Sequence, residues 1–312
     1  MATVAFTPRR KHEFTGSCPQ VSCNKDGWIV MVYNSGSKMY SIVGLIERNN
    51  ISWGNTRPQP ITTGHYPKVA INDENTVVEV HKSQWWKTAW YRVGTLDVHT
   101  KAIRWCSKDF PIGNPSGCNP AVALTNEGTV IIAYERSDET YYRVGKINET
   151  ATEIIWKDQV DRQFFNIGSL EPSISMNENG LVVAVARTPY GCKIIFRVGY
   201  LENDNIIKWK EVDHEVSMGE LMYGWGPTVA INEKNHIIAV YMSYVWRRLR
   251  IRYGVINNDT KKIEWRETTA EPFDYGFGQL PSITMNSKGQ VVRMHESNLG
   301  YGMFYEVGAL SE

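Results

Sequence analysis

Apolar and polar residues alternate in six short segments of the chain, and each of these segments begins close to a proline. Two examples are PKVAIN from Pro67 and PTVAIN from Pro227. The six prolines are Pro19, Pro67, Pro120, Pro172, Pro227 and Pro281. Alternation with a period of two predicts β-strands, and recurrence about every 50 residues predicts an array of similar structural units.

Each repeat contains three further strand signals. Only Gly or Asn stands eight residues after each proline, which predicts a hairpin turn with a positive φ. A nearly continuous apolar run follows, such as TVIIAY from Thr129, and then a segment related to YYRVGKIN from Tyr141. The glycine of that segment recurs as Gly44, Gly94, Gly145, Gly199, Gly254 and Gly308. A short fourth segment ends in tryptophan, at Trp53, Trp105, Trp156, Trp209 and Trp265.

The sixth repeat lacks a fourth strand of its own, because the sequence ends at Glu312, soon after Gly308. The segment TVAF, which ends at Phe6, can supply it, since its spacing from Pro19 is close to that of Trp53 from Pro67. Such a strand closes a ring and leaves no exposed sheet edge. We therefore predict an all-β fold, a six-bladed β-propeller of four-stranded antiparallel blades, as a single domain over residues 1–312. A parallel β-solenoid is the alternative, but it does not explain the offset between the first and last repeats.

The overall composition narrows the classes of partner. Lys and Arg number 34 and Asp and Glu 33, so the net charge of +1 predicts no nucleic-acid partner. No apolar run approaches the roughly 20 residues that span a bilayer, so we predict no membrane insertion. The N-terminal residues lack the apolar core of a signal peptide, and five cysteines suit no disulfide framework. We expect a cytoplasmic protein, or one released without a classical signal peptide, and leave a homo-oligomer open.

The connections between strands differ on the two faces of the predicted ring. Second-to-third and fourth-to-first connections emerge together on one face, called here the variable face, and they are aromatic, polar and different in each repeat. The turns on the opposite face, such as NDEN and NENG, are nearly uniform. A constant scaffold with variable loops predicts a binding site in those loops. The candidate ligand-binding residues are His65, Tyr66, His81, Ser83, Trp85, Trp86, Arg136, Asp138, Tyr190, Trp225, Tyr244, Trp246, His295, Ser297 and Tyr301.

Exposed aromatic rings beside hydroxyl, amide and charged groups suit sugars, whose C–H faces stack on rings while their hydroxyls form hydrogen bonds. Repetition strengthens such shallow sites through avidity. We therefore predict a multivalent, non-enzymatic glycan-binding protein whose partners are glycans or glycoproteins. The best candidate site is the group around Tyr66, His81 and Trp85. The competing interpretation is that these aromatic side chains fill gaps between blades, and a protein-interaction scaffold of the WD40 type is the alternative function.

The repeat pattern P-x-V-A-I-N, Y-R-V-G and I-x-W resembles β-propeller lectins of the tachylectin-like, tectonin-like and fucose-binding families in architecture, over the whole chain. This resemblance implies carbohydrate binding, with no residue carried over. An enzyme is the less favoured expectation, because the S-x-D-x-G-x-T-W box of sialidases is absent. The inner strands also offer no acidic ring for the calcium of a lactonase-like propeller. No metal-ligand motif or nucleotide-binding loop occurs, so we predict no metal, no cofactor and no catalytic residue.

Overall fold

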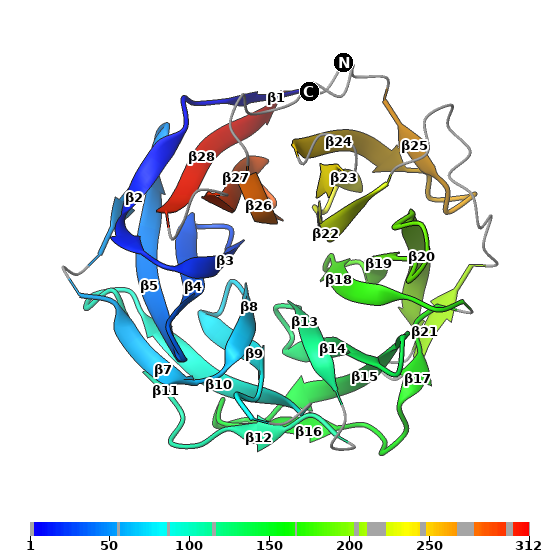
Figure 1. The fold of residues 1–312 in the computed structure, drawn as a ribbon, viewed down its shortest axis with the longest axis horizontal. Coiled ribbons are helices and arrows are strands. Elements are labelled where there is room, and N and C mark those ends of the chain that lie inside the picture. Colours follow the sequence, from blue (N-terminus) through cyan, green and yellow to red (C-terminus); the bar gives the residue numbers. More distant parts are fainter. Residues whose placement is uncertain are drawn as a thin grey trace.

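The structure is a computed structural model, and it describes residues 3–54, 57–85, 88–113, 117–165, 167–202, 206–210, 223–243, 248–266, 278–297 and 302–311. Six antiparallel sheets form a ring around a central axis (Figure 1). The described residues contain strands and turns and no helix. None of them therefore belongs to a helix that could cross a membrane. The six-bladed all-β propeller predicted from the repeats is confirmed, and a solenoid is excluded.

Each sheet contains one repeat, with its first strand nearest the axis (Figure 1). Blade 1 consists of β3 (Ser17–Cys23), β4 (Trp28–Ser35), β5 (Lys38–Glu47), β6 (Asn50–Trp53) and β7 (Gln59–Thr63). Blade 2 consists of β8 (His65–Ile71), β9 (Thr76–Lys82), β10 (Ala89–Asp97), β11 (Ala102–Trp105) and β12 (Phe110–Pro111). Blade 3 consists of β13 (Cys118–Leu124), β14 (Thr129–Arg136), β15 (Glu139–Ile147), β16 (Ile154–Trp156) and β17 (Arg162–Gln163).

The other three blades share the four-strand order, and blades 4 and 5 have no fifth strand among the described residues. Blade 4 consists of β18 (Leu170–Met176), β19 (Leu181–Arg187), β20 (Ile194–Glu202) and β21 (Ile206–Trp209). Blade 5 consists of β22 (Gly224–Ile231), β23 (His236–Ser243), β24 (Leu249–Ile256) and β25 (Ile263–Trp265). Blade 6 consists of β26 (Gly278–Met285), β27 (Gln290–Ser297) and β28 (Gly302–Ser311), completed by β1 (Thr3–Phe6) and β2 (Arg10–Thr15) from the other end of the chain.

The N-terminal strand closes the ring as predicted. Strand β1 pairs antiparallel with β28, with Phe6 opposite Gly308, and the two chain ends lie side by side (Figure 1). In the other blades the same register places tryptophan opposite glycine, for example Trp105 opposite Gly94. A Cβ on Gly94 would lie 2.8 Å from the Trp105 ring, and one on Gly308 would lie 2.9 Å from the Phe6 ring. The repeated glycine is therefore needed because an outer aromatic ring packs directly over it.

The core is divided into six apolar clusters, each lying between two neighbouring blades. The second strands are buried on both faces, which explains their nearly continuous apolar sequence, as in the wholly buried Val130, Ile131 and Ile132. The hairpin position eight residues after each proline has a positive φ, 84° at Gly27 and 64° at Asn75. Only Gly and Asn occupy it because they tolerate this conformation best.

Candidate functional site

The sequence-predicted residues do not form one cluster. Three of the predicted aromatic side chains are exposed: Tyr66 by 44%, Trp85 by 81% and Tyr190 by 92%. His65, Ser83, Trp225 and Ser297 are half-buried. Trp86, Tyr244, Trp246 and Tyr301 lie outside the described residues.

The two candidate histidines lie in the protein interior. His81 is 2% exposed, and its Nδ1 lies 3.0 Å from an oxygen of the fully buried Glu79. Burial alone would lower the pKa of His81, but the charge and hydrogen bond of Glu79 raise it above its ordinary value. His295 is 1% exposed and stacks on Phe304. Both histidines hold second strands in place, and neither is open to a ligand.

Arg136 and Asp138 have local structural partners. The Arg136 guanidinium lies 2.9 Å from an Asp161 oxygen and 4.0 Å from the centre of the Tyr141 ring. Asp138 is exposed at a turn, with a φ of 62°, and its carbonyl accepts a hydrogen bond from the Ser169 amide. These contacts orient the second-to-third loop of blade 3.

A ring of strained residues, called here the mouth ring, surrounds the axis on the variable face. Its members stand just before the repeated prolines, where the register of each inner strand shifts by a β-bulge. They are Cys18, Tyr66, Asn119, Glu171, Gly226 and Leu280, with φ between 46° and 56°. A residue other than glycine in this left-handed region costs roughly 1–3 kcal/mol, and such strain clusters at functional sites. The bulges direct six unlike residues to one opening.

Three carboxylates contact backbone or side-chain groups of the mouth ring, Glu135 and Glu171 at blades 3 to 5 and Glu296 at blades 6 and 1. Glu135 Oε2 accepts hydrogen bonds from the Glu171 amide at 3.1 Å and from Asn119 Nδ2 at 2.9 Å. Glu171 Oε2 accepts from the Gly226 amide at 2.7 Å, and its Oε1 lies 3.0 Å from Arg187 Nε. Glu296 Oε2 accepts from the Cys18 amide at 3.0 Å. The carboxylates are therefore fixed by contacts between neighbouring blades, and Arg187 compensates the charge of Glu171.

One lysine lies inside this opening. Lys68 follows Pro67, and its Nζ donates a hydrogen bond to Gln20 of the neighbouring blade at 2.8 Å. Burial lowers the pKa of Lys68 to about 8, while Cys18 and Glu171 act in the opposite direction. Burial also raises the pKa of Cys18 to about 11, with Glu296 adding to the effect. These groups, from four different blades, share one electrostatic environment at the mouth ring.

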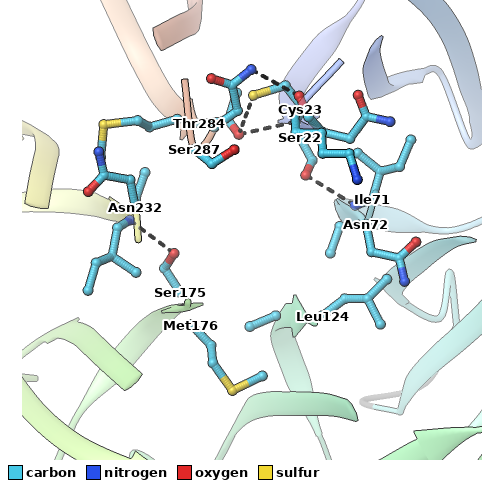
Figure 2. Close-up of a pocket in the computed structure, with 18 of the residues that line it drawn as sticks. Ser22, Cys23, Ile71, Asn72, Leu124, Ser175, Met176, Asn232, Thr284 and Ser287 are labelled. Atoms are coloured by element: carbon cyan, nitrogen blue, oxygen red, sulfur yellow. Dashed lines mark hydrogen bonds between the residues drawn. The ribbon is translucent and has the colours of Figure 1, made fainter. Parts of the chain in front are cut away.

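Below the mouth ring, a central cavity of about 310 Å³ extends toward the opposite face. Figure 2 shows the side chains around it, with small hydroxyls such as Ser22 and Ser175 between apolar groups such as Leu124 and Met176. The hydroxyls join the blades, since Ser22 Oγ accepts from the Ile71 amide at 3.2 Å (Figure 2). Among the described residues, no three His, Cys, Asp or Glu side chains are placed to hold a metal ion.

Sequence reasoning found Tyr66 but missed the rest of the mouth ring. The residue before a proline is expected to be extended, so the pattern gave no reason to assign left-handed backbone to six such positions. The available signal was the recurring G-x-x-P of the fourth-to-first connections, which contains this position in most repeats. Glu135 and Glu171 come from different blades, and no local motif could have paired them.

Comparison with known proteins gives the fold and no closer kinship. No family model matches the sequence, and no curated protein matches it. The structure resembles the "Hadza microbial sialidase Hz136" (TM-score 0.61, 12% identity), covering 96% of this chain and 66% of that one. It also resembles a Penicillium chrysogenum α-L-arabinanase complexed with arabinobiose (TM-score 0.60, 13% identity). That match covers 98% of this chain and 97% of the arabinanase. A third similar structure is the GH93 α-L-arabinofuranosidase of Fusarium graminearum with arabinobiose (TM-score 0.62, 10% identity). The match covers 97% of this chain and 94% of that one.

These findings correct two expectations from the sequence. The prediction of a non-enzymatic lectin is wrong, and so is the statement that the chain is not an enzyme. The similar structures are titled as a sialidase, an arabinanase and arabinofuranosidases, and the lectin-type families considered above are not supported. Local sequence motifs do not reveal carboxylates that separate blades bring together, such as Glu135 and Glu171. Since all identities lie below 25%, the likeness itself establishes the propeller fold alone.

Proposed function

We propose that the chain is a glycan-cleaving enzyme whose active site is the mouth ring. The observation that carries the proposal is that Glu135 and Glu171 lie at neighbouring blades of an opening framed by strained backbone, where the Glu171 amide donates to Glu135. Hydrolysis of a glycosidic bond commonly uses two carboxyl groups, one to donate a proton and one to act on the anomeric carbon or on water. The three similar structures described above, a sialidase, an arabinanase and an arabinofuranosidase, are enzymes that act on sugars, and they support the same class of reaction.

The roles are assigned by a difference in partners: Glu171 has an arginine at 3.0 Å, whereas the partners of Glu135 in the described part of the chain are neutral donors. Glu171 is the charged group in this proposal, because Arg187 and the Gly226 amide both stabilise a carboxylate. It faces the positive charge that develops at the anomeric carbon. Glu135 donates a proton to the oxygen of the leaving group as the glycosidic bond breaks, and a water molecule then adds its hydroxyl to the anomeric carbon and returns its other proton to Glu135. Tyr66, which is 44% exposed at the same opening, offers an apolar ring to the sugar.

A panel of aryl glycosides and short oligosaccharides, including sialosides and arabinofuranosides, tests the proposal. We expect release of the aglycone or of a new reducing end from at least one member. We expect Glu135→Gln and Glu171→Gln each to lower the rate by at least about 100-fold, the usual contribution of a general acid or base. Absence of hydrolysis across the panel, or hydrolysis that survives both substitutions, would overturn it.

A further inference from the structure

Five of the six junctions between neighbouring blades follow one packing rule. The third-strand residue three positions before the repeated glycine contacts the outer aromatic residue of the next blade. Tyr91 meets Trp156 with ring centres 5.7 Å apart, and Phe196 meets Trp265 at 5.0 Å. The same pairing joins Tyr142 to Trp209 and Tyr305 to Trp53, and Ile251 shares an apolar cluster with Phe6.

The junction between blades 1 and 2 breaks this rule. Its third-strand residue is Ser41, which pairs with Val32 just as Tyr91 pairs with Val80. Ser41 Oγ accepts a hydrogen bond from Trp105 Nε1 at 3.4 Å, so the tryptophan of the next blade is present but the facing ring is absent. A cavity of about 260 Å³ lies at this place. Its walls are Ser41, Ile42, Val43, Gly54, Arg57, Gln59, Lys101 and Ala102.

A glutamine forms the backbone hydrogen bonds that a tyrosine hydroxyl forms at the next junction. At the next junction, the Tyr91 hydroxyl accepts from the Ile154 amide at 3.2 Å and donates to the Ile154 carbonyl at 3.4 Å. At the junction of blades 1 and 2, the side chain of Gln59 bonds the equivalent Ile103, at 3.1 Å to the amide and 2.6 Å to the carbonyl. The backbone is therefore satisfied without the phenol, and the volume of its ring is left open.

The charges around this cavity are all positive. Arg57 and Lys101 line it, and none of the eight lining residues is acidic. Within the described part of the chain, no carboxylate lies at ion-pair distance from either cation. The aliphatic stem of Lys101 rests on Gly54, where an added Cβ would lie 2.7 Å from the Lys101 Cβ. The cavity thus joins an apolar wall to two uncompensated cationic groups, which favour an anion.

We propose that this cavity, the Ser41 cavity, binds a small aromatic carboxylate of the benzoate type. The aromatic ring takes the place that tyrosine or phenylalanine fills at the other junctions, and the carboxylate meets Arg57 and Lys101. The volume is sufficient, since a cavity of about 150 Å³ holds benzene. The site is separate from the mouth ring, because Gly54 and Arg57 follow the outer strand of blade 1.

Isothermal titration of the whole protein with benzoate, 4-hydroxybenzoate, benzyl alcohol and inorganic phosphate tests this site. We expect one equivalent of an aromatic acid to bind, at least about tenfold more tightly than either benzyl alcohol or phosphate. No benzoate binding at ~10 mM, or phosphate binding as tight as benzoate binding, contradicts the proposal.

Two kinds of variant locate the binding. Ser41→Tyr fills the cavity with the side chain found at the equivalent places, so it should abolish benzoate binding. The double variant Arg57→Gln/Lys101→Gln alters exposed or half-buried side chains and keeps the fold even if Ser41→Tyr does not. It should weaken benzoate binding at least about tenfold, whereas Lys38→Gln, an exposed position on β5, should not. Undiminished binding in the double variant places the ligand elsewhere and overturns the proposal.

Discussion

The two ends of the central axis are built from the same repeat but differ in character. On the uniform face, six equivalent turn residues form what we call the turn ring: Lys25, Asp73, Asn126, Glu178, Glu233 and Ser287. Four of these side chains, those of Asp73, Asn126, Glu178 and Glu233, accept a hydrogen bond from a backbone amide of the preceding blade, for example Glu178 from the Asn126 amide at 3.0 Å. The mouth ring also fixes carboxylates through backbone amides, as in the bond from the Glu171 amide to Glu135.

The difference lies in the backbone and in the cations. The turn ring stands in regular hairpin turns, whereas five non-glycine members of the mouth ring have left-handed backbone. Burial raises the pKa of Glu178 and Glu233, so their surroundings disfavour charge. Glu171 instead has Arg187 at 3.0 Å. A ring of carboxylates therefore does not by itself mark a site, and the strain and the paired charge distinguish the mouth ring.

The largest expected contrast between the openings is in turnover. Glu171→Gln should lower the rate on any substrate found by at least about 100-fold, because it removes the carboxylate that Arg187 holds. Glu178→Gln is the matched control, since glutamine still accepts the Asn126 amide bond, and its rate should stay within about twofold of wild type. Steady-state kinetics of both variants measure this contrast. Equal losses of turnover rate in Glu171→Gln and Glu178→Gln would show that the two ends do not differ in function.

A second contrast is in stability against pH. The pKa of Lys68 is lowered to about 8, so the charged form is penalised in the folded state. That penalty is fully present below pH 8 and is lost as the pH rises toward the unfolded value near 10.5. Lys68→Met should therefore raise the free energy of unfolding at pH 7 by on the order of 1–3 kcal/mol.

Denaturant unfolding between pH 7 and about pH 10 measures this difference. The gain from Lys68→Met should shrink as the pH rises. Lys25→Met at the turn ring should give no gain, because its side chain is 47% exposed. A gain from Lys68→Met that is the same at both ends of the pH range would show that charge burial is not its cause.

The smallest contrast concerns backbone strain within the mouth ring. Gly226→Ala places a Cβ at a φ of 56° and should lower the free energy of unfolding by about 1 kcal/mol. Tyr66→Gly relieves the same strain, and it should cause no loss of stability although it removes a large side chain. Tyr66→Gly should still reduce turnover, because the aromatic side chain that contacts the sugar in the proposed site is lost. Thermal unfolding of Gly226→Ala and Tyr66→Gly tests this expectation. A loss of several kcal/mol of stability in Tyr66→Gly would contradict backbone strain at Tyr66.

Periodicity alone was enough to predict the blades, because each repeat has the same alternation, the same turn and the same outer aromatic residue. Phe6 could be aligned with the tryptophans from spacing, and its pairing with Gly308 confirms this. The candidate site was harder to predict from the sequence, because its residues come from different blades and become neighbours only in the folded ring. The polarity of His81 at a variable position suggests a ligand contact, but its partner is the buried Glu79 of the same strand. A sequence pattern does not reveal which face of a fully buried strand holds an ion pair.

The most direct test of the central claim is a crystal structure of Glu171→Gln with an oligosaccharide that the wild-type protein cleaves. The account predicts a sugar at the mouth ring, with its glycosidic oxygen within hydrogen-bond distance of Glu135 and a ring face against Tyr66. A sugar bound at the turn ring, or only at the exposed Trp85 and Tyr190 away from the axis, would contradict it.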